Sequence, residues 1–169
     1  KVEDRQSKIN SLQSQINPHF LYNTLECIRS EAVCQECDSI ARMAKALASF
    51  FRYSISRKEN VVTIEDELNN IQHYIMIQNY RFEDKFLFQV EMVPEDKRVY
   101  ACQIPKMTIQ PIVENAIFHG LETKQGECRV AIRIRLTKNL VLLTVSDNGI
   151  GMDERELKKL RDGMEQESV

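Results

Sequence analysis

The stretch INPHFLYNTLECI, from Ile16 to Ile28, decides how the first part of this chain folds, because it sets a proline beside a histidine within a helical pattern. Apolar residues recur at helical spacing: Leu21, Leu25, Ile28 and Ala32. A polar stripe lies about 200° around the same helix: His19, Asn23, Glu26 and Ser30. We therefore expect His19 to face solvent. Proline inside a helix costs roughly 3 kcal/mol, so we expect Pro18 to kink the helix and aim His19.

Composition excludes several classes of protein. The 169 residues carry a formal net charge of −2, which does not favour nucleic acid or a membrane surface as a partner. No apolar run approaches the roughly 18 residues of a membrane span, and we expect no signal peptide. Because the chain opens in a helical pattern without an initial methionine, we expect a cytoplasmic fragment of a longer protein.

The cysteines leave two interpretations. Cys34 and Cys37 form a CxxC pair, which binds zinc or is redox-active in some proteins. No second CxxC and no nearby histidine completes a zinc site with four ligands. We therefore favour five reduced, incidental thiols, and their odd number fits a reducing compartment.

Residues 1–57 predict a coiled-coil lead-in followed by a helical hairpin. The lead-in has heptad spacing at Val2, Ile9, Leu12 and Ile16. A second apolar stripe follows at Ile40, Met43, Leu47, Phe50 and Phe51. Two helices that join near residues 34–38 indicate an antiparallel hairpin whose apolar faces need a partner. A dimeric four-helix bundle is the simplest way to bury both faces.

Residues 58–169 predict an α+β domain. Thr63 and Asp66 form an approximate capping box for the helix that follows. KFLFQVEMV, VAIRIRL and LVLLTVSD have the pattern of strands, the last two joined by a turn at residues 138–139. IPKMTIQPIVENAIFHG, residues 104–120, predicts a helix that ends at a glycine, and MDERELKKLRDG a charged helix. We expect helices against one face of a mixed, mostly antiparallel sheet.

Two motifs of this domain predict a ligand. In DNGIGM, a strand delivers Asp147 to a turn whose two glycines let the backbone approach a ligand closely. In PIVENAIFHG, Asn115 and His119 share a helix face beside Glu114, so we expect buried polar groups that need partners. A nucleotide with its Mg²⁺ would supply them, since Mg²⁺ takes oxygen ligands and shares them with phosphates. An exposed polar helix edge is the alternative.

The segments LQSQINPHFLYNTL, IPKMTIQPIVENAIFHG and VSDNGIGM, in this order and spacing, resemble the sensor histidine kinases of the LytS/YesM type. The intervening helix is similar too, so the resemblance extends from Leu12 to Met152. It implies a membrane receptor whose cytoplasmic part combines a dimerising histidine hairpin with an ATP-binding α/β sandwich of the GHKL type. In that family, His19 would be the phosphoacceptor, and Asn23 would orient the imidazole or the incoming phosphoryl group.

The resemblance also implies the residues that hold ATP and Mg²⁺: Glu114, Asn115, His119, Asp147, Gly149 and Gly151. Asn115 would coordinate Mg²⁺, with Glu114 or His119 assisting. Asp147 would accept a hydrogen bond from the adenine amino group, and the two glycines would shape the loop beneath the base. The imidazole would attack the γ-phosphorus in line, and the phosphoryl group would then pass to an aspartate of a response regulator.

Two features depart from the family pattern. Phe20 follows the histidine where many histidine kinases have an acid, so Glu26, another group or water would take the ring proton. The chain ends at MEQESV, before the flexible ATP lid, second glycine box and last strand and helix of the family. We therefore expect a C-terminally incomplete ATP-binding domain.

Two other functions compete with this one. A GHKL ATPase without phosphohistidine, as in gyrase, MutL or the large heat-shock chaperones, has a water-activating glutamate four residues before Asn115, where this chain has Pro111. A non-catalytic dimeric scaffold fits the missing acid and lid. It does not explain why His19, Asn115 and Asp147 occur together.

Overall fold

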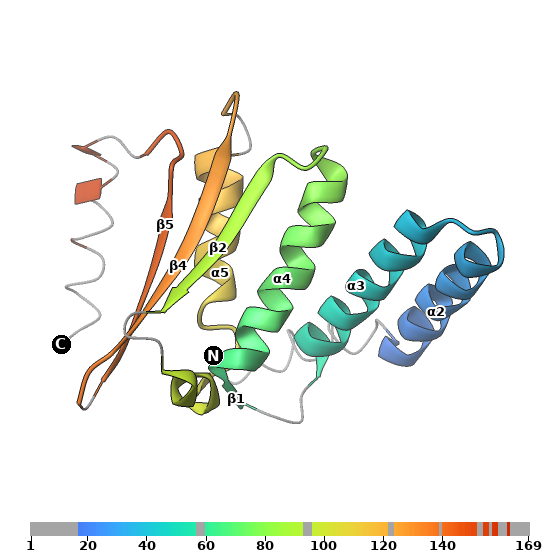
Figure 1. Ribbon diagram of the computed structural model, residues 1–169, viewed down its shortest axis with the longest axis horizontal. Coiled ribbons are helices and arrows are strands. Elements are labelled where there is room, and N and C mark those ends of the chain that lie inside the picture. Colours follow the sequence, from blue (N-terminus) through green and yellow to red (C-terminus); the bar gives the residue numbers. More distant parts are fainter. Residues whose placement is uncertain are drawn as a thin grey trace, which may run out of the picture. The chain divides into compact units, whose positions relative to one another are not determined.

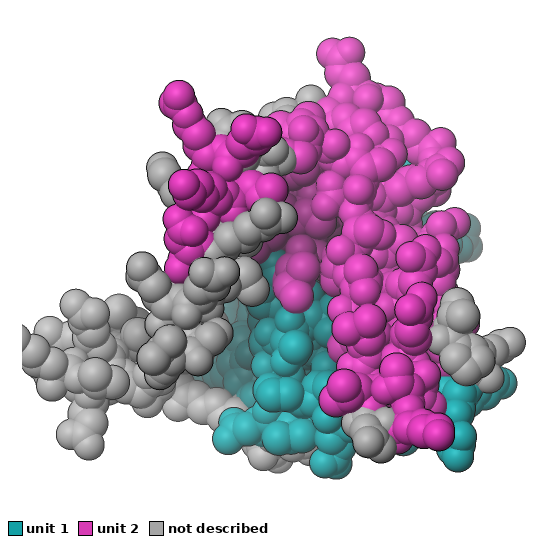
Figure 2. All heavy atoms as spheres, turned by 90° about the vertical axis from the view of Figure 1, so that its left-hand side faces the viewer, with its two compact units in different colours: residues 1–86, 96–111 teal, residues 87–95, 112–169 magenta. Residues whose placement is uncertain are grey.

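The computed structural model describes residues 17–56, 60–92, 96–121, 124–138 and 140–151, together with residues 154, 155, 157, 158 and 162. The predicted coiled-coil lead-in and most of the predicted helix over residues 152–163 lie outside them. Two compact units are coloured separately in Figure 2: residues 1–86 and 96–111 form unit 1, and residues 87–95 and 112–169 form unit 2. These units are defined by contacts within the fold and do not test domain boundaries. The predicted domain boundary after residue 57 therefore stays a prediction.

A helical hairpin opens unit 1, with α2 over Pro18–Cys34 and α3 over Asp38–Ile55 (Figure 1). The Asn17 side chain caps α2, since its Oδ1 accepts from the backbone N–H groups of His19 at 3.1 Å and Phe20 at 3.3 Å. Proline suits the first helical position, because the N–H that it lacks would have no helical partner there. The predicted kink is therefore wrong: Pro18 begins the helix and places His19 in its first turn.

The turn of the hairpin is a helix cap built without glycine. The Cys37 N–H donates to the Ala32 carbonyl oxygen at 2.8 Å. The Glu36 N–H donates to the Val33 carbonyl oxygen at 3.1 Å. This pair of bonds is a Schellman motif, whose left-handed position is usually glycine. Here Glu36 occupies it, with a φ of 56°.

Small side chains make up most of the buried residues of the hairpin, whose helices α2 and α3 contact each other. The buried residues of the hairpin are Leu25, Ala32, Ala41, Ala44, Ala46 and Ala48. Other members of the predicted apolar stripes remain partly open, with Ile28 46% exposed and Ile40 39% exposed. The hairpin alone therefore does not bury the apolar side chains that the sequence sets at helical spacing.

Helix α4, over Ile64–Arg81, carries much of the core of unit 1. The predicted capping box is confirmed: Thr63 Oγ1 accepts from the Asp66 N–H and Asp66 Oδ2 accepts from the Thr63 N–H, both at 3.1 Å. Strand β1, Val61–Thr63, leads into this helix and pairs antiparallel with β3, Gln103–Pro105. A short 3-10 helix, η1, covers Lys97–Ala101. The buried apolar residues of the unit include Ile64, Leu68, Ile71, Ile75, Phe86, Val99 and Ile109.

The predicted helix over residues 104–120 is wrong at its start. Ile104 lies in β3 and pairs with Val62, and the helix, α5, begins only at Gln110 and runs to Asn115. Met107 between them has a φ of 63°, a left-handed conformation that a right-handed helix does not contain. Strand pairing therefore overrides the helical pattern in the first residues of this segment.

Unit 2 contains a three-stranded sheet, in the strand order β2, β4, β5 (Figure 1). The strands cover Phe86–Met92, Cys128–Leu136 and Val141–Asp147. Strands β4 and β5 pair antiparallel, with Val130 opposite Asp147 and Leu136 opposite Val141. These strands confirm the sequence-based expectation and the α+β class.

Helix α5 continues into a π-helical turn, η2, over Ala116–Leu121, which contacts β4 and β5. Gly120 therefore lies inside the helical segment, which ends one residue later than predicted. The buried residues between the helical segment and the sheet include Val113, Ala116, Ile117, Leu121, Cys128, Val130, Ile132 and Ile134. Within the described part of the chain, no helix has the length and apolar character to span a bilayer.

Replacing Glu36 with glycine should stabilise the hairpin. Glycine adopts the left-handed conformation without the steric cost that other residues have there, so we expect Glu36→Gly to raise the free energy of unfolding by about 0.5–1 kcal/mol. Thermal unfolding followed by circular dichroism measures the change. Gln35→Gly is the matched control, because Gln35 has a negative φ of −94° and gains nothing from glycine. Equal effects of the two substitutions would contradict the strain at Glu36.

His73 should make unit 1 less stable in acid. Burial, with a smaller effect of the Lys45 charge, lowers the pKa of His73 from 6.5. The unfolded chain then binds more protons as the pH falls below about 6.5, so the free energy of unfolding decreases there. We expect His73→Gln to reduce this decrease between about pH 7.5 and pH 5.5, as measured by urea unfolding. The same acid dependence in both proteins would exclude His73 as the cause.

Candidate functional site

The first candidate site lies in the first turn of α2. His19 is exposed, as predicted, and its Nδ1 lies 3.2 Å from the side-chain nitrogen of Asn23, four residues further along the helix. A side-chain amide can donate through its nitrogen or accept through its oxygen, so Asn23 can hold either neutral tautomer of the ring. With the amide turned over, the Asn23 oxygen would accept from Nδ1–H, and Nε2 would carry the lone pair. The predicted pair of residues is thus brought together.

Glu26 follows on the same helix, but it is already paired. The Arg29 Nε lies 2.8 Å from Glu26 Oε2, within one turn of α2. Phe20, which follows the histidine, is 70% exposed. Phe20 has no carboxylate, and the carboxylate of Glu26 is paired with Arg29. Neither position therefore supplies an unpaired acid for the His19 ring.

The second candidate site is a cavity of about 480 Å³ in unit 2. Described residues that line it come from α5, η2, β5 and the turn after β5: Ile112, Asn115, Ala116, His119, Gly120, Val145, Asp147 and Gly151. Three of these side chains are apolar, three carry an amide, an imidazole or a carboxylate, and two of the residues are glycines. A cavity of this size with a few convergent polar groups is typical of small-molecule sites.

The turn after β5 fixes the Asp147 carboxylate. Asp147 Oδ1 accepts from the Gly149 N–H at 2.8 Å, and the Ile150 N–H donates to the Gly120 carbonyl oxygen at 3.1 Å. A Cβ atom on Gly149 would lie only 2.4 Å from that carbonyl oxygen and 2.6 Å from Asp147 Oδ1. Glycine is therefore required at position 149 so that the turn can reach the helical segment.

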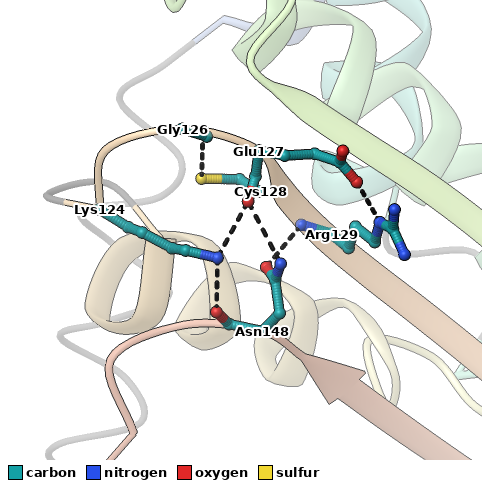
Figure 3. A network of polar contacts seen from close by, with 6 residues as sticks. All are labelled: Lys124, Gly126, Glu127, Cys128, Arg129 and Asn148. Carbon is teal, nitrogen blue, oxygen red and sulfur yellow. Dashed lines mark hydrogen bonds and ion pairs between the residues drawn. The ribbon is translucent and has the colours of Figure 1, made fainter.

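A network of polar contacts also holds Asn148, which belongs to the same turn (Figure 3). The Lys124 ammonium donates to the carbonyl oxygens of Asn148 at 2.7 Å and Glu127 at 2.9 Å. The Asn148 side chain donates to the Glu127 carbonyl oxygen at 3.2 Å and accepts from the Arg129 N–H at 2.8 Å. Asn148 thus fastens the turn to the start of β4, next to Asp147.

The structure brings most of the predicted ligand-binding residues to one cavity. Asn115, His119, Asp147 and Gly151 line it, and Gly149 lies in the adjoining turn. Glu114 is not among the described lining residues. The expectation that these polar groups are buried in the helix is wrong, because Asn115 and His119 are exposed on the cavity side and Glu114 is half-buried.

The donor set bears on which metal the cavity could hold. Among the described residues, no group of three or more His, Cys, Asp or Glu side chains could bind a metal ion by itself, and this includes Cys34 and Cys37. Mg²⁺ commonly keeps few protein ligands and shares phosphate oxygens. The amide oxygen of Asn115 and the acceptors of the cavity fit an ion held mainly by a nucleotide.

Comparisons with known proteins match both parts of the chain. A family model described as "Histidine kinase" matches residues 7–86, and one described as "Histidine kinase-, DNA gyrase B-, and HSP90-like ATPase" matches residues 104–168. The chain is 42% identical over 154 residues to Sensor histidine kinase YesM of Bacillus subtilis, a match that covers 91% of the chain and 26% of that protein. This chain belongs to the sensor histidine kinases.

Two further sensor kinases are similar. Sensor histidine kinase YpdA of Escherichia coli is 36% identical, with 91% of the chain and 26% of that protein covered. Sensor protein kinase HptS of Staphylococcus aureus is 32% identical, with 95% and 30% covered. The chain thus spans less than a third of the length of these sensor kinases.

Sequence reasoning missed part of the cavity of this sensor kinase chain. It treated Gly120 as a helix end, whereas the structure places this residue on the cavity wall, against the Asp147 turn. It also missed the apolar wall formed by Ile112, Ala116 and Val145. The wall residues have the same apolar pattern as core residues, so only the fold distinguishes them. The sequence holds one local indication that Gly120 lines the cavity, which is that it directly follows the candidate ligand residue His119.

Alanine at the two turn glycines should have unequal effects. Gly149→Ala would push a Cβ into backbone, so we expect it to lower the free energy of unfolding by about 3 kcal/mol. Gly151 has a φ of 73° and open space around its Cβ position. Gly151→Ala should therefore cost only about 1 kcal/mol, the strain of a left-handed residue. Denaturant unfolding measures both, and an equal loss would contradict the close approach at Gly149.

Proposed function

We propose that this chain is the kinase portion of a two-component sensor that binds ATP in the cavity of unit 2 and phosphorylates itself on His19. The observation that carries the proposal is the cavity itself, in which Asn115, His119 and Asp147 converge beside an apolar wall. The match to the ATPase family model over residues 104–168 supports ATP as the ligand.

The cavity suits an adenine nucleotide by its chemistry. A purine base is apolar on its faces, and Ile112, Ala116 and Val145 offer an apolar surface. Its exocyclic amino group is a donor, and Asp147 is an acceptor already oriented by the Gly149 N–H. Asn115 and His119 would then lie on the side of the phosphates and their Mg²⁺. When bound, Mg²⁺ would offset the negative charge of the phosphate oxygens.

His19 has the properties of a nucleophile that is held in place. Its ring is exposed, and Asn23 contacts Nδ1 at 3.2 Å. When the Nδ1–H group donates to the Asn23 side-chain oxygen, the Nε2 lone pair attacks the γ-phosphorus, the bond to the β,γ-bridging oxygen breaks, and its electron pair leaves with ADP. Because Glu26 is paired with Arg29, we propose that water accepts the ring proton.

The partners follow from the same family. We propose that the hairpin forms a homodimer, because it leaves Ile28 and Ile40 partly exposed. A response regulator would then take the phosphoryl group from the exposed His19 onto an aspartate. In the whole protein, we propose that this chain lies on the cytoplasmic side of a membrane receptor.

Autophosphorylation tests the proposal. The full-length protein is incubated with γ-labelled ATP and Mg²⁺, beside its His19→Gln, Asn115→Ala and His73→Gln variants. We expect acid-labile, base-stable label on the wild type, none on His19→Gln, and a loss of at least about tenfold in Asn115→Ala, because the phosphate site loses an oxygen ligand. His73→Gln is the matched control and keeps its label.

Label that survives His19→Gln would refute His19 as the phosphoacceptor. Nucleotide binding without any label would instead favour the non-catalytic scaffold. Release of inorganic phosphate without a labelled protein would favour an ATPase.

A further inference from the structure

A buried carboxylate in unit 1 joins three segments of the chain. Glu67, on α4, has 0% of its surface exposed. Its Oε1 accepts from the Met107 N–H at 2.6 Å, and its Oε2 accepts from the Ile109 N–H at 3.0 Å. The same Oε1 also accepts from the phenol hydroxyl of Tyr53, near the end of α3. One side chain therefore holds the second hairpin helix and the residues that precede α5.

Because Glu67 is buried, its carboxylate depends on these hydrogen bonds. A carboxylate in the core is tolerated only when donors surround it, and removing a donor leaves the charge poorly satisfied. Burial, followed by the hydrogen bond to Glu67, raises the pKa of the Tyr53 phenol, so this hydroxyl remains a donor at neutral pH. Neither Glu67 nor Tyr53 belongs to the His19 site or lines the cavity.

The same helix holds α5 at a second point. Asn70, three residues after Glu67, donates through its side-chain nitrogen to Gln110, the first residue of α5, and both residues are buried. Glu67 also fixes the left-handed turn at Met107. Helix α4 therefore determines where α5 starts, and α5 ends at Asn115.

We propose that Glu67 and Tyr53 are positioning residues that tie the end of the histidine hairpin to residues 107–109, directly before α5. The proposal rests on the proposed kinase function. A buried polar link is seldom more stable than an apolar replacement of the same size. We therefore assign the link a role in positioning: it fixes the end of α3 relative to residues 107–109, which directly precede α5.

Tyr53→Phe tests the link, because it removes one hydroxyl and keeps the ring. The measurements are the autophosphorylation rate at saturating ATP and the dissociation constant of ATP, both in the full-length protein. We expect the rate to fall about tenfold, as for the loss of one hydrogen bond to a charged group, and the dissociation constant to stay within about twofold. Tyr80→Phe is the matched control, since Tyr80 is 53% exposed and should change neither quantity.

The alternatives separate cleanly when all variants are assayed below their measured unfolding temperatures. An unchanged rate in Tyr53→Phe would overturn the proposal. An equal loss of rate and of ATP affinity would overturn it too, because the hydroxyl would then support the cavity and not the relation between hairpin and α5.

Amide hydrogen exchange provides a readout that needs no kinase activity. Tyr53→Phe should speed exchange at residues 106–110, and Tyr80→Phe should not. Unchanged exchange in this segment would refute the link whatever the enzyme does. A wild-type protein that acquires no label on His19 would refute the proposed function instead, and exchange would still decide whether the link exists.

Discussion

The enclosed negative charge of Glu67 is the constraint on which unit 1 depends. It can stay buried only where Tyr53, Met107 and Ile109 bring their donors to it. A backbone hydrogen bond joins the same two segments, since the Lys106 N–H donates to the Asn60 carbonyl oxygen at 2.9 Å. Residues before α4 and residues before α5, about forty positions apart, are therefore held side by side, and β1 with β3 is the visible result.

Elements governed by neighbouring residues could be predicted from the sequence. The capping box at Thr63 and the strands around residues 130–147 follow from spacing along a single stretch. Pro18 was misplaced because the same dipeptide suits a kink or a helix start, and the Asn17 cap decides between them. The segment at Ile104 has a helical pattern, but its pairing with Val62 is a contact between distant residues, which no local pattern reveals.

The candidate site divides in the same way. Polar residues within apolar surroundings, such as Asn115 and Asp147, stand out in the sequence, and they do meet at one cavity. Gly120 was not recognised, because its role arises from the approach of Gly149, which belongs to a turn after a different strand. The Lys124 contacts were likewise unpredictable. Lys124 donates to backbone carbonyl oxygens, which every residue has, so no residue type in the sequence indicates them.

The start of α2 has an electrostatic consequence. A helix that begins at Pro18 directs the positive end of its dipole toward the neighbourhood of His19, and its first turn contains no acidic residue. A phosphoryl group on the imidazole would bring about two negative charges to that end. The helix would favour the phosphorylated ring over the unmodified one. Asn17 and Pro18 thus place His19 at the end of the helix where the dipole stabilises added negative charge.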